Sequence, residues 1–305
     1  MKKIIVTTTI NPPTEAIEKF DALEDWDLIV IGDKKTPADY SLKRGRYVPP
    51  AEQEAYDKAL SDAIGWNCIQ RRNFGFLLAH DAGADLIATV DDDNIPFEGW
   101  GPSLILDEKP SVRLYKCDLP VFDPIGATEY GHLWHRGYPL QLLHKRKYDV
   151  FEDGASIDRI DVQADFWNGD PDIDAMCRME HRPDCTFKDD IFPLASDTWS
   201  PFNSQNTFLK ADVLKNYFMF PHVGRMDDIW GSYFLQAKGG RVAYNKATVR
   251  QDRNVHDFTK DMVKEFLGYE HNLKLVEALH EDAEKIYDFI PKESGNSFDL
   301  YRKHF

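Results

Sequence analysis

The sequence predicts an α/β fold in which helices flank a mainly parallel central sheet. Residues 2–10 (KKIIVTTTI) and 26–33 (WDLIVIGD) are short, apolar and rich in β-branched side chains without strict alternation, which is typical of buried parallel strands. A third such strand is expected over residues 84–90, after a turn at Gly83. With helices between them, these strands have the β-α-β-α-β order of a doubly wound nucleotide-binding half.

The two connecting helices have recognisable sequence signals. The first is expected over residues 14–23, where Thr14 follows two prolines and is a suitable N-cap. The second is expected over residues 66–82. The residues of these helices that are expected to face the sheet are Ile17, Phe20, Leu23, Phe74, Leu77 and Leu78.

The composition is that of a globular protein with a substantial core. The chain has 305 residues, of which 42% are hydrophobic and 13% aromatic. We expect a single domain: residues 1–100 form the nucleotide-binding half, residues 101–256 a second half, and residues 257–305 a C-terminal helical extension.

Charge and targeting signals narrow the possible partners. The formal net charge of -15 argues against broad binding to nucleic acid or anionic membranes. No apolar stretch approaches the ~20 residues needed to cross a bilayer, and the N-terminus lacks the features of a signal peptide. The sequence therefore predicts a cytoplasmic protein that does not span a membrane. Its scattered cysteines, expected to be reduced core residues, are Cys68, Cys117, Cys177 and Cys185.

Three consecutive aspartates, Asp91, Asp92 and Asp93, follow the third predicted strand. Their mutual repulsion would be relieved by a bound cation. If the strand end is extended, Asp91 and Asp93 share one face and Asp92 points away, which is the D-x-D arrangement. Carboxylate oxygens suit Mg²⁺ or Mn²⁺, which also bind substrate phosphates. The alternative is an acidic turn that caps the following segment, but we predict a metal site at Asp91 and Asp93.

Three polar stretches in the second half are candidate ligand-binding segments. Two of them have both a ligand-binding and a structural interpretation, and the third is rejected as a calcium site. Residues 131–143 (GHLWHRGYPLQLL) place aromatic rings around Arg136, either to bind sugar and phosphate or as a packed turn with Arg136 in a structural ion pair. Residues 201–208 (PFNSQNTF) suit a hydroxyl-rich ligand or a simple polar turn. Residues 168–175 (NGDPDIDA) lack the Gly and Glu of an EF-hand, so a calcium loop is rejected.

The last third of the chain adds acids and a histidine. Residues 224–240 predict a helix with Asp227 and Asp228 at its N-terminus, and its expected inward residues are Ile229, Trp230, Tyr233, Phe234 and Ala237. One acid is enough for an N-cap, so the other is a candidate general base. His256 is either a third metal ligand or an ordinary surface histidine.

Several of these motifs together resemble a known family. In order, TTTINPPTEAI, GDKKTP, RRNFGF, DDDN, RGYPL, NGDPDIDA, PFNSQNT and DDIWGSYF are similar to the STELLO family of glycosyltransferase-like proteins, over most of the chain. RRNFGF, DDDN, RGYPL and GRMDDIW also resemble, more distantly, the reversibly glycosylated polypeptides, which are UDP-arabinopyranose mutases. Both resemblances imply a GT-A nucleotide-sugar fold, in which residues 101–256 would form the donor-sugar and acceptor half.

The resemblance also implies roles for individual residues. Asp33, which ends the second predicted strand, would contact the nucleobase, while Asp91 and Asp93 would bind the metal and diphosphate. His256 would match the C-terminal metal ligand. The other residues expected to bind the nucleotide sugar are Thr8, Arg72, Asp92 and Arg136.

We therefore predict a glycosyltransferase that uses Mn²⁺ or Mg²⁺ and a nucleoside-diphosphate sugar, with UDP-sugar as the expected donor. Arg72 or Arg136 would help the metal to stabilise the leaving diphosphate. Asp227 or Asp228 would take the proton of a hydroxyl acceptor on a glycan, a lipid-linked sugar or another molecule. STELLO proteins have a membrane anchor and further domains, neither of which is recognisable in this sequence, so a free-standing catalytic module is expected.

Three alternatives belong to other classes. Arg136 matches the mutase arginine that carries the sugar, but a second mutase arginine is replaced by Leu143, which favours transfer to an acceptor over a mutase reaction. A two-metal nuclease or polymerase also uses clustered aspartates, but an acidic chain lacks a basic path for the strand. The third alternative is a non-catalytic binding protein with the GT-A fold.

Overall fold

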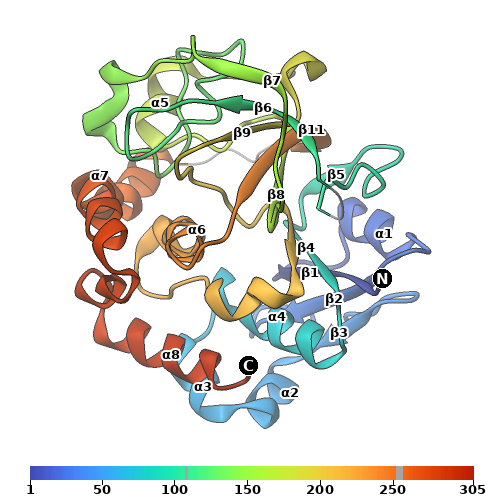
Figure 1. The fold of residues 1–305 in the computed structure, drawn as a ribbon. Helices are drawn as coiled ribbons and strands as arrows, with labels where there is room; N and C mark the ends of the chain where they lie inside the picture. Colours follow the sequence, from blue (N-terminus) through green and yellow to red (C-terminus); the bar gives the residue numbers. More distant parts are fainter. Residues whose placement is uncertain (107–108, 252–256) are drawn as a thin grey trace.

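The computed structural model describes residues 1–106, 109–251 and 257–305 (Figure 1). One mixed sheet runs through these residues in the order β3-β2-β1-β4-β10-β8-β11-β9-β6-β7, and β5 pairs with β11. The strands are β1 Lys3–Thr9, β2 Asp27–Gly32, β3 Arg46–Val48, β4 Leu86–Val90, β5 Asn94–Pro96, β6 Ser111–Tyr115, β7 Phe151–Ser156, β8 Val162–Gly169, β9 Leu194–Ser196, β10 Asn206–Lys210 and β11 Val242–Gln251.

The helices connect and cover the sheet. The α-helices are α1 Glu15–Asp21, α2 Pro50–Tyr56, α3 Lys58–Ile64, α4 Arg72–Asp81, α5 Ala175–His181, α6 Asp227–Ala237, α7 Phe258–Glu281 and α8 Lys292–Arg302. The 3-10 helices are η1 Ile69–Arg71, η2 Leu140–Lys145, η3 Asp189–Ile191, η4 Ala211–Asn216, η5 Gly224–Met226 and η6 Ala283–Asp288.

The N-terminal part of the sheet has the predicted doubly wound topology. Strand β1 is parallel to both β2 and β4, and β2 is parallel to β3. Successive residues of β1 enter different cores: Ile5 packs in the cluster that contains Phe20 of α1, while Ile4 and Val6 pack in the cluster that contains Phe74 of α4. The connections therefore cover opposite faces, and the order of the strands reverses between β1 and β4. In such sheets ligands bind at this switch point, beyond the carboxyl ends of the strands.

The predicted elements of this part are confirmed, and some were missed. The Thr14 hydroxyl accepts a hydrogen bond from the backbone N–H of Ile17 at 3.2 Å, as expected for an N-cap. Helix α4 begins later than predicted because the preceding residues form η1. Strand β3 and helices α2 and α3 were not predicted, since each has seven residues or fewer and shows little periodicity.

The remainder of the sheet mixes strand directions. Strand β10 lies antiparallel between β4 and β8, and β11 is parallel to β8. As a result β1, β2, β3, β4, β8 and β11 all run in the same direction. The α/β fold class with a mainly parallel central sheet is confirmed, and β10 joins its two parts.

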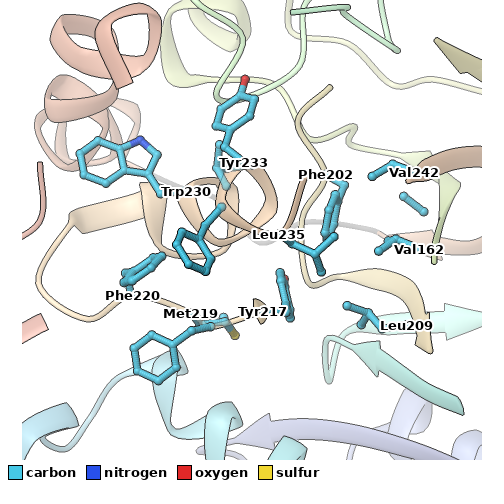
Figure 2. Packing of buried hydrophobic residues seen from close by; sticks show 14 of the residues in the cluster. Val162, Phe202, Leu209, Tyr217, Met219, Phe220, Trp230, Tyr233, Leu235 and Val242 are labelled. Atoms are coloured by element: carbon cyan, nitrogen blue, oxygen red, sulfur yellow. The ribbon is translucent and has the colours of Figure 1, made fainter. Parts of the chain in front are cut away.

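Helix α6 lies in the centre of the molecule and is buried along almost its whole length (Figure 1). Figure 2 shows Trp230, Tyr233 and Leu235 projecting from it in different directions among other apolar side chains. Gly137 has a φ of +91°, and a Cβ atom there would lie 2.3 Å from Ile229 of α6. A glycine at this position therefore allows the segment that carries Arg136 to pack directly on α6.

The C-terminal residues, expected as a helical extension, form α7, η6 and α8 on one side of the molecule (Figure 1). Helix α7 packs against α5 and α6, and its Asn272 accepts a hydrogen bond from the indole N–H of Trp230 at 2.8 Å. Helix α8 packs against α3. In the described ranges, no helix is both long enough and apolar enough to cross a membrane.

Candidate functional site

The candidate site lies where the carboxyl ends of β1, β2 and β4 meet. After Val90 the chain leaves β4 in a turn, in which the backbone N–H of Asn94 donates to the carbonyl oxygen of Asp91 at 3.3 Å. The three aspartates thus lie on a turn, and the prediction of an extended strand end with alternating side chains is wrong. Each of the three carboxylates bonds a different partner, as described below.

Asp91 pairs with a buried arginine. Its Oδ1 lies 2.7 Å from Nη2 of Arg72, and the Asp91 side chain is 25% exposed while that of Arg72 is 1% exposed. Arg72 also donates to Oγ1 of Thr8 at 3.2 Å and to the carbonyl oxygen of Ser204 at 2.7 Å. Burial raises the pKa of the Asp91 carboxyl, and the Arg72 charge opposes this shift. Arg72 therefore fixes Asp91 relative to β1 and to the segment before β10.

Asp92 connects the turn to the end of β1. Its Oδ2 accepts hydrogen bonds from Oγ1 of Thr9 at 2.5 Å and from Nδ2 of Asn11 at 3.2 Å. Its backbone carbonyl accepts a hydrogen bond from the hydroxyl of Thr14, the residue that caps α1. These contacts join the ends of β1 and β4 across the switch point.

Asp93 is bonded to the end of β11. Nε2 of Gln251 donates to both carboxylate oxygens of Asp93, at 3.2 Å each. Gln251 is 3% exposed. In the described part of the chain, its Oε1 is a buried oxygen with no hydrogen-bond partner. No sequence pattern indicated Gln251, which is 158 residues away from Asp93.

The residues of the turn fit a hard divalent cation. His256, the predicted third ligand, lies outside the described residues. Among residues 1–106, 109–251 and 257–305, no group of three or more His, Cys, Asp or Glu side chains is arranged to hold a metal. Mg²⁺ and Mn²⁺ sites commonly use only one or two carboxylates and take other oxygens from substrate phosphates. Asp91 and Asp93 satisfy that requirement.

Asp33 lies at the carboxyl end of β2, as predicted, and is buried. Its Oδ1 accepts from the backbone N–H groups of Lys34 at 2.6 Å and Asn67 at 2.9 Å. Its Oδ2 accepts from the backbone N–H of Cys68 at 3.1 Å. The carboxylate therefore holds the loop before η1 against the end of β2.

Arg136 is the cation of a buried ion-pair cluster. Its guanidinium binds Asp172 through two bonds, from Nε at 2.8 Å and from Nη2 at 3.1 Å. It also donates to both oxygens of Asp228, at 3.1 and 3.3 Å, and to the carbonyl oxygen of Arg225. These contacts use all five of its N–H groups. Of the two interpretations of residues 131–143, the structure shows the ion pair.

Asp172 was missed by sequence reasoning, although it belongs to the acidic stretch that was rejected as a calcium loop. Burial disfavours its charged form, but Arg136 and His135 outweigh that effect and lower the pKa of the Asp172 carboxyl. Nδ2 of Asn203 adds a third hydrogen bond to this carboxylate, at 2.9 Å. No strand was predicted before Asp172, and its partner Arg136 lies 36 positions away, so no local pattern indicated its role.

The segment PFNSQNTF connects the two arginines. The backbone N–H and hydroxyl of Ser204 donate to Oδ2 of Asp228 at 3.0 and 3.2 Å, while its carbonyl oxygen accepts from Arg72. The segment is buried and its polar groups bond to protein partners, as a polar turn would. The Asp91–Arg72 pair and the Asp228–Arg136 pair thus share one continuous hydrogen-bond network.

The paired acids of α6 have different surroundings. The N-cap of α6 is Met226 and makes no side-chain hydrogen bond, so the prediction that Asp227 or Asp228 caps this helix is wrong. Both acids are instead in the first turn and point to tertiary partners. Oδ2 of Asp227 accepts from Nε2 of Gln70 at 2.7 Å. Burial and the neighbouring Asp228 raise the pKa of the Asp227 carboxyl to about 7, so it exchanges a proton near neutral pH.

No family model matches the sequence of this chain. It is 25% identical over 275 residues to Probable glycosyltransferase STELLO1 of Arabidopsis thaliana and 24% identical over 277 residues to STELLO2 of the same plant. The chain is similar to STELLO proteins. These matches cover 83% of this chain but only 36% of each relative, so the chain spans about a third of their length.

Solved structures with a similar chain trace include glucosyl-3-phosphoglycerate synthase from Mycobacterium tuberculosis. Its complex with Mn²⁺, UDP-glucose and phosphoglyceric acid has a TM-score of 0.48 and 11% sequence identity, covering 90% of this chain and 80% of that chain. Its complex with UDP has a TM-score of 0.46 and 12% identity, with the same coverage. At these TM-scores the correspondence of the traces is partial.

Proposed function

We propose that this protein is a GT-A-type, metal-dependent glycosyltransferase that moves a sugar from a nucleoside-diphosphate sugar, a UDP-sugar, to a hydroxyl acceptor. The observation that carries this proposal is the aspartate turn at the switch point between β1 and β4, held there by Thr9 and Arg72. The similarity to two proteins named as probable glycosyltransferases supports it.

In this proposal Asp91 and Asp93 hold Mn²⁺ or Mg²⁺, which when bound supplies positive charge beside the leaving diphosphate. Arg72 acts as a positioning residue, because its contacts with Thr8, Asp91 and Ser204 orient the Asp91 carboxylate. Arg136 is likewise a positioning residue, since its five N–H groups already bond to protein acceptors.

Asp227 is the proposed general base. A base works best when its pKa is near the working pH, and the pKa of Asp227 is about 7. Asp228 is less suited because its oxygens hold Arg136 and Ser204. In a single displacement, the acceptor oxygen attacks the anomeric carbon as the bond to the diphosphate oxygen breaks. The acceptor proton passes to Asp227, and the bonding electrons leave with the diphosphate.

Calorimetry tests the donor and metal parts of the proposal. UDP-, GDP- and CDP-sugars are titrated into the protein with Mn²⁺ and with EDTA, and we expect UDP-sugar to bind in a Mn²⁺-dependent way. Asp91→Asn and Asp93→Asn should each weaken this binding by about tenfold or more, because an amide does not neutralise a cation. Asp153→Asn, on the exposed strand β7, is the matched control.

Wild-type UDP affinity and Mn²⁺ dependence in both Asp91→Asn and Asp93→Asn would show that the turn is not the metal site. Transfer is then measured with radiolabelled UDP-sugar and a set of glycan and lipid-linked acceptors. Isomerised UDP-arabinose formed without an acceptor would indicate a mutase instead. Donor binding without any turnover would indicate a binding protein.

A further inference from the structure

The junction between η1 and α4 carries two side chains that reach different parts of the proposed site. Arg72, the first residue of α4, bonds to Asp91 of the aspartate turn at 2.7 Å. Two residues earlier, Nε2 of Gln70 donates to Oδ2 of Asp227 at 2.7 Å. One short segment therefore contacts both the proposed metal site and the proposed general base.

The backbone around Gln70 is fixed from both sides. Before η1, Oδ2 of Asp33 accepts a hydrogen bond from the backbone N–H of Cys68 at 3.1 Å. Directly after Gln70, the buried Arg71 donates from Nε to Oε1 of Gln53 at 2.8 Å. Neither contact involves the Gln70 side chain, so η1 is anchored whether or not that side chain has a partner.

A second glutamine–aspartate pair shows what is particular to this one. In β8, Nε2 of Gln163 donates to Oδ1 of Asp165, also at 2.7 Å. The other oxygen of Asp165 accepts a hydrogen bond from the hydroxyl of Thr248 at 2.8 Å. In Asp227, by contrast, Gln70 bonds to Oδ2 alone, and no other side chain of the described residues donates to this carboxylate. Both oxygens of Asp165 are thus used within the protein, whereas Oδ1 of Asp227 remains available.

We propose that Gln70 is a positioning residue for the general base: it holds Oδ2 of Asp227, so that Oδ1 is left to take the proton of the acceptor hydroxyl; this inference rests on the proposed function. An N–H group that donates to a carboxylate favours the ionised form, which is the form that accepts a proton. The bond also restricts rotation of the carboxylate. Gln70 therefore both orients the base and helps to keep it ionised.

The other charged and titratable groups around Asp227 do not replace this bond. Burial and the neighbouring Asp228 raise the pKa of the Asp227 carboxyl, while Arg136 and Gln70 oppose that rise. The bonds of Arg136, however, go to Asp228 and not to Asp227. Tyr217 also interacts with both acids, but burial holds the pKa of its hydroxyl well above the usual range, so it is uncharged. Within the described part of the chain, Gln70 is thus the side chain that bonds directly to the base.

The experiment measures the pKa of Asp227 without turnover and compares it with the pH profile of transfer. The full chain is labelled with ¹³C at the side-chain carboxyl carbon of aspartate, and the Asp227 signal is identified by its loss in Asp227→Asn. In Gln70→Leu, which is of similar size but has no donor, this pKa should rise by about 1 or more, as expected for the loss of one hydrogen bond to a charged group. The acid limb of transfer from radiolabelled UDP-sugar should move to higher pH with it, so the loss of activity at pH 7 should diminish in alkaline buffer.

Gln163→Leu is the matched control, because it removes the same kind of bond from Asp165. It should lower the melting temperature and leave both the pKa of Asp227 and the acid limb unchanged. An unchanged pKa of Asp227 in Gln70→Leu would overturn the inference and leave the proposed function intact.

If Gln70→Leu does not fold, Gln70→Asn decides. Its amide is one methylene group shorter and does not reach Asp227, so the pKa should again rise, and an unchanged pKa overturns the inference. An acid limb that stays in place while the pKa of Asp227 rises, or wild-type transfer by Asp227→Asn, would instead refute the proposed base, and this inference with it.

Discussion

Two groups of aspartates in this protein have opposite relations to their surroundings. Asp172 and Asp228 are buried on either side of Arg136, and their bonds occupy four of the five guanidinium N–H groups, while the fifth donates to the carbonyl oxygen of Arg225. The aspartate turn after β4 is partly exposed, and of its carboxylates Asp91 is paired with Arg72, while Asp92 bonds to neutral donors.

The difference teaches how similar acids can stabilise the fold in one place and, in the proposed function, bind a ligand in another. Inside the protein, the N–H groups of Arg136 donate to the oxygens of Asp172 and Asp228, so these three residues form a closed cluster whose charged groups bond to one another. At the turn, three adjacent carboxylates lie at one edge of the sheet, and Arg72 pairs with Asp91 there. Carboxylate oxygens that lie together at a sheet edge are suitable ligands for a hard divalent cation.

The largest expected effect comes from breaking the closed cluster. Arg136→Met should lower the free energy of unfolding by about 3–5 kcal/mol, because it leaves Asp172 and Asp228 buried without a positive partner. Urea unfolding measures this. The control Arg113→Met removes the exposed pair with Asp153 and should cost about 0–1 kcal/mol. Unchanged stability with lost UDP-sugar binding would mean that Arg136 contacts the donor directly.

The two acids of α6 are expected to differ in role: Asp227 in sugar transfer and Asp228 in the stability of the Arg136 cluster. Asp227→Asn should reduce sugar transfer by roughly 100-fold while keeping donor binding and without a loss of stability, because an amide accepts the Gln70 hydrogen bond but not a proton. Asp228→Asn should instead destabilise the fold, since Asp228 neutralises Arg136. Steady-state transfer and urea unfolding are measured for both. Wild-type turnover in Asp227→Asn and Asp228→Asn would remove both residues as the base.

The pH dependence of stability and of sugar transfer tests the role of Asp227. The pKa of Asp227 is about 7 in the folded protein, against 3.8 for an ordinary aspartate, so its contribution to stability is present below pH 3.8 and is lost as the pH rises through 7. Asp227→Asn should therefore gain stability relative to wild type between these values. Transfer by wild type should fall below pH 7, where the base is protonated. Parallel unfolding curves across this range would show that Asp227 is ionised throughout.

The smallest effect is expected at the link between the turn and α1. Thr14→Ala should cost about 1 kcal/mol of unfolding free energy, because it removes the N-cap of α1. The same hydroxyl donates to the carbonyl oxygen of Asp92, so UDP binding in the presence of Mn²⁺ should weaken slightly. Thr14→Ser retains the hydroxyl and should match wild type in both measurements. An equal loss in Thr14→Ser would point to the methyl group instead.

The sequence by itself determined the features that depend on near neighbours along the chain. Short β-branched segments specified β1, β2 and β4, the hydroxyl of Thr14 specified the start of α1, and strand ends located Asp33 and the aspartate turn. These features could be predicted because strand burial, helix capping and turn chemistry involve residues only a few positions apart.

Only the tertiary structure decided which charged and polar side chains bond to one another across long stretches of sequence. Arg136 meets Asp172 and Asp228 from 36 and 92 positions away, and Gln251 reaches Asp93 from 158 positions away. No local pattern encodes such pairs, because they depend on which strands become neighbours and on how closely α6 packs on the sheet. For the same reason the sequence left Arg136 between two interpretations and assigned Asp227 or Asp228 to a helix cap that the folded chain does not use.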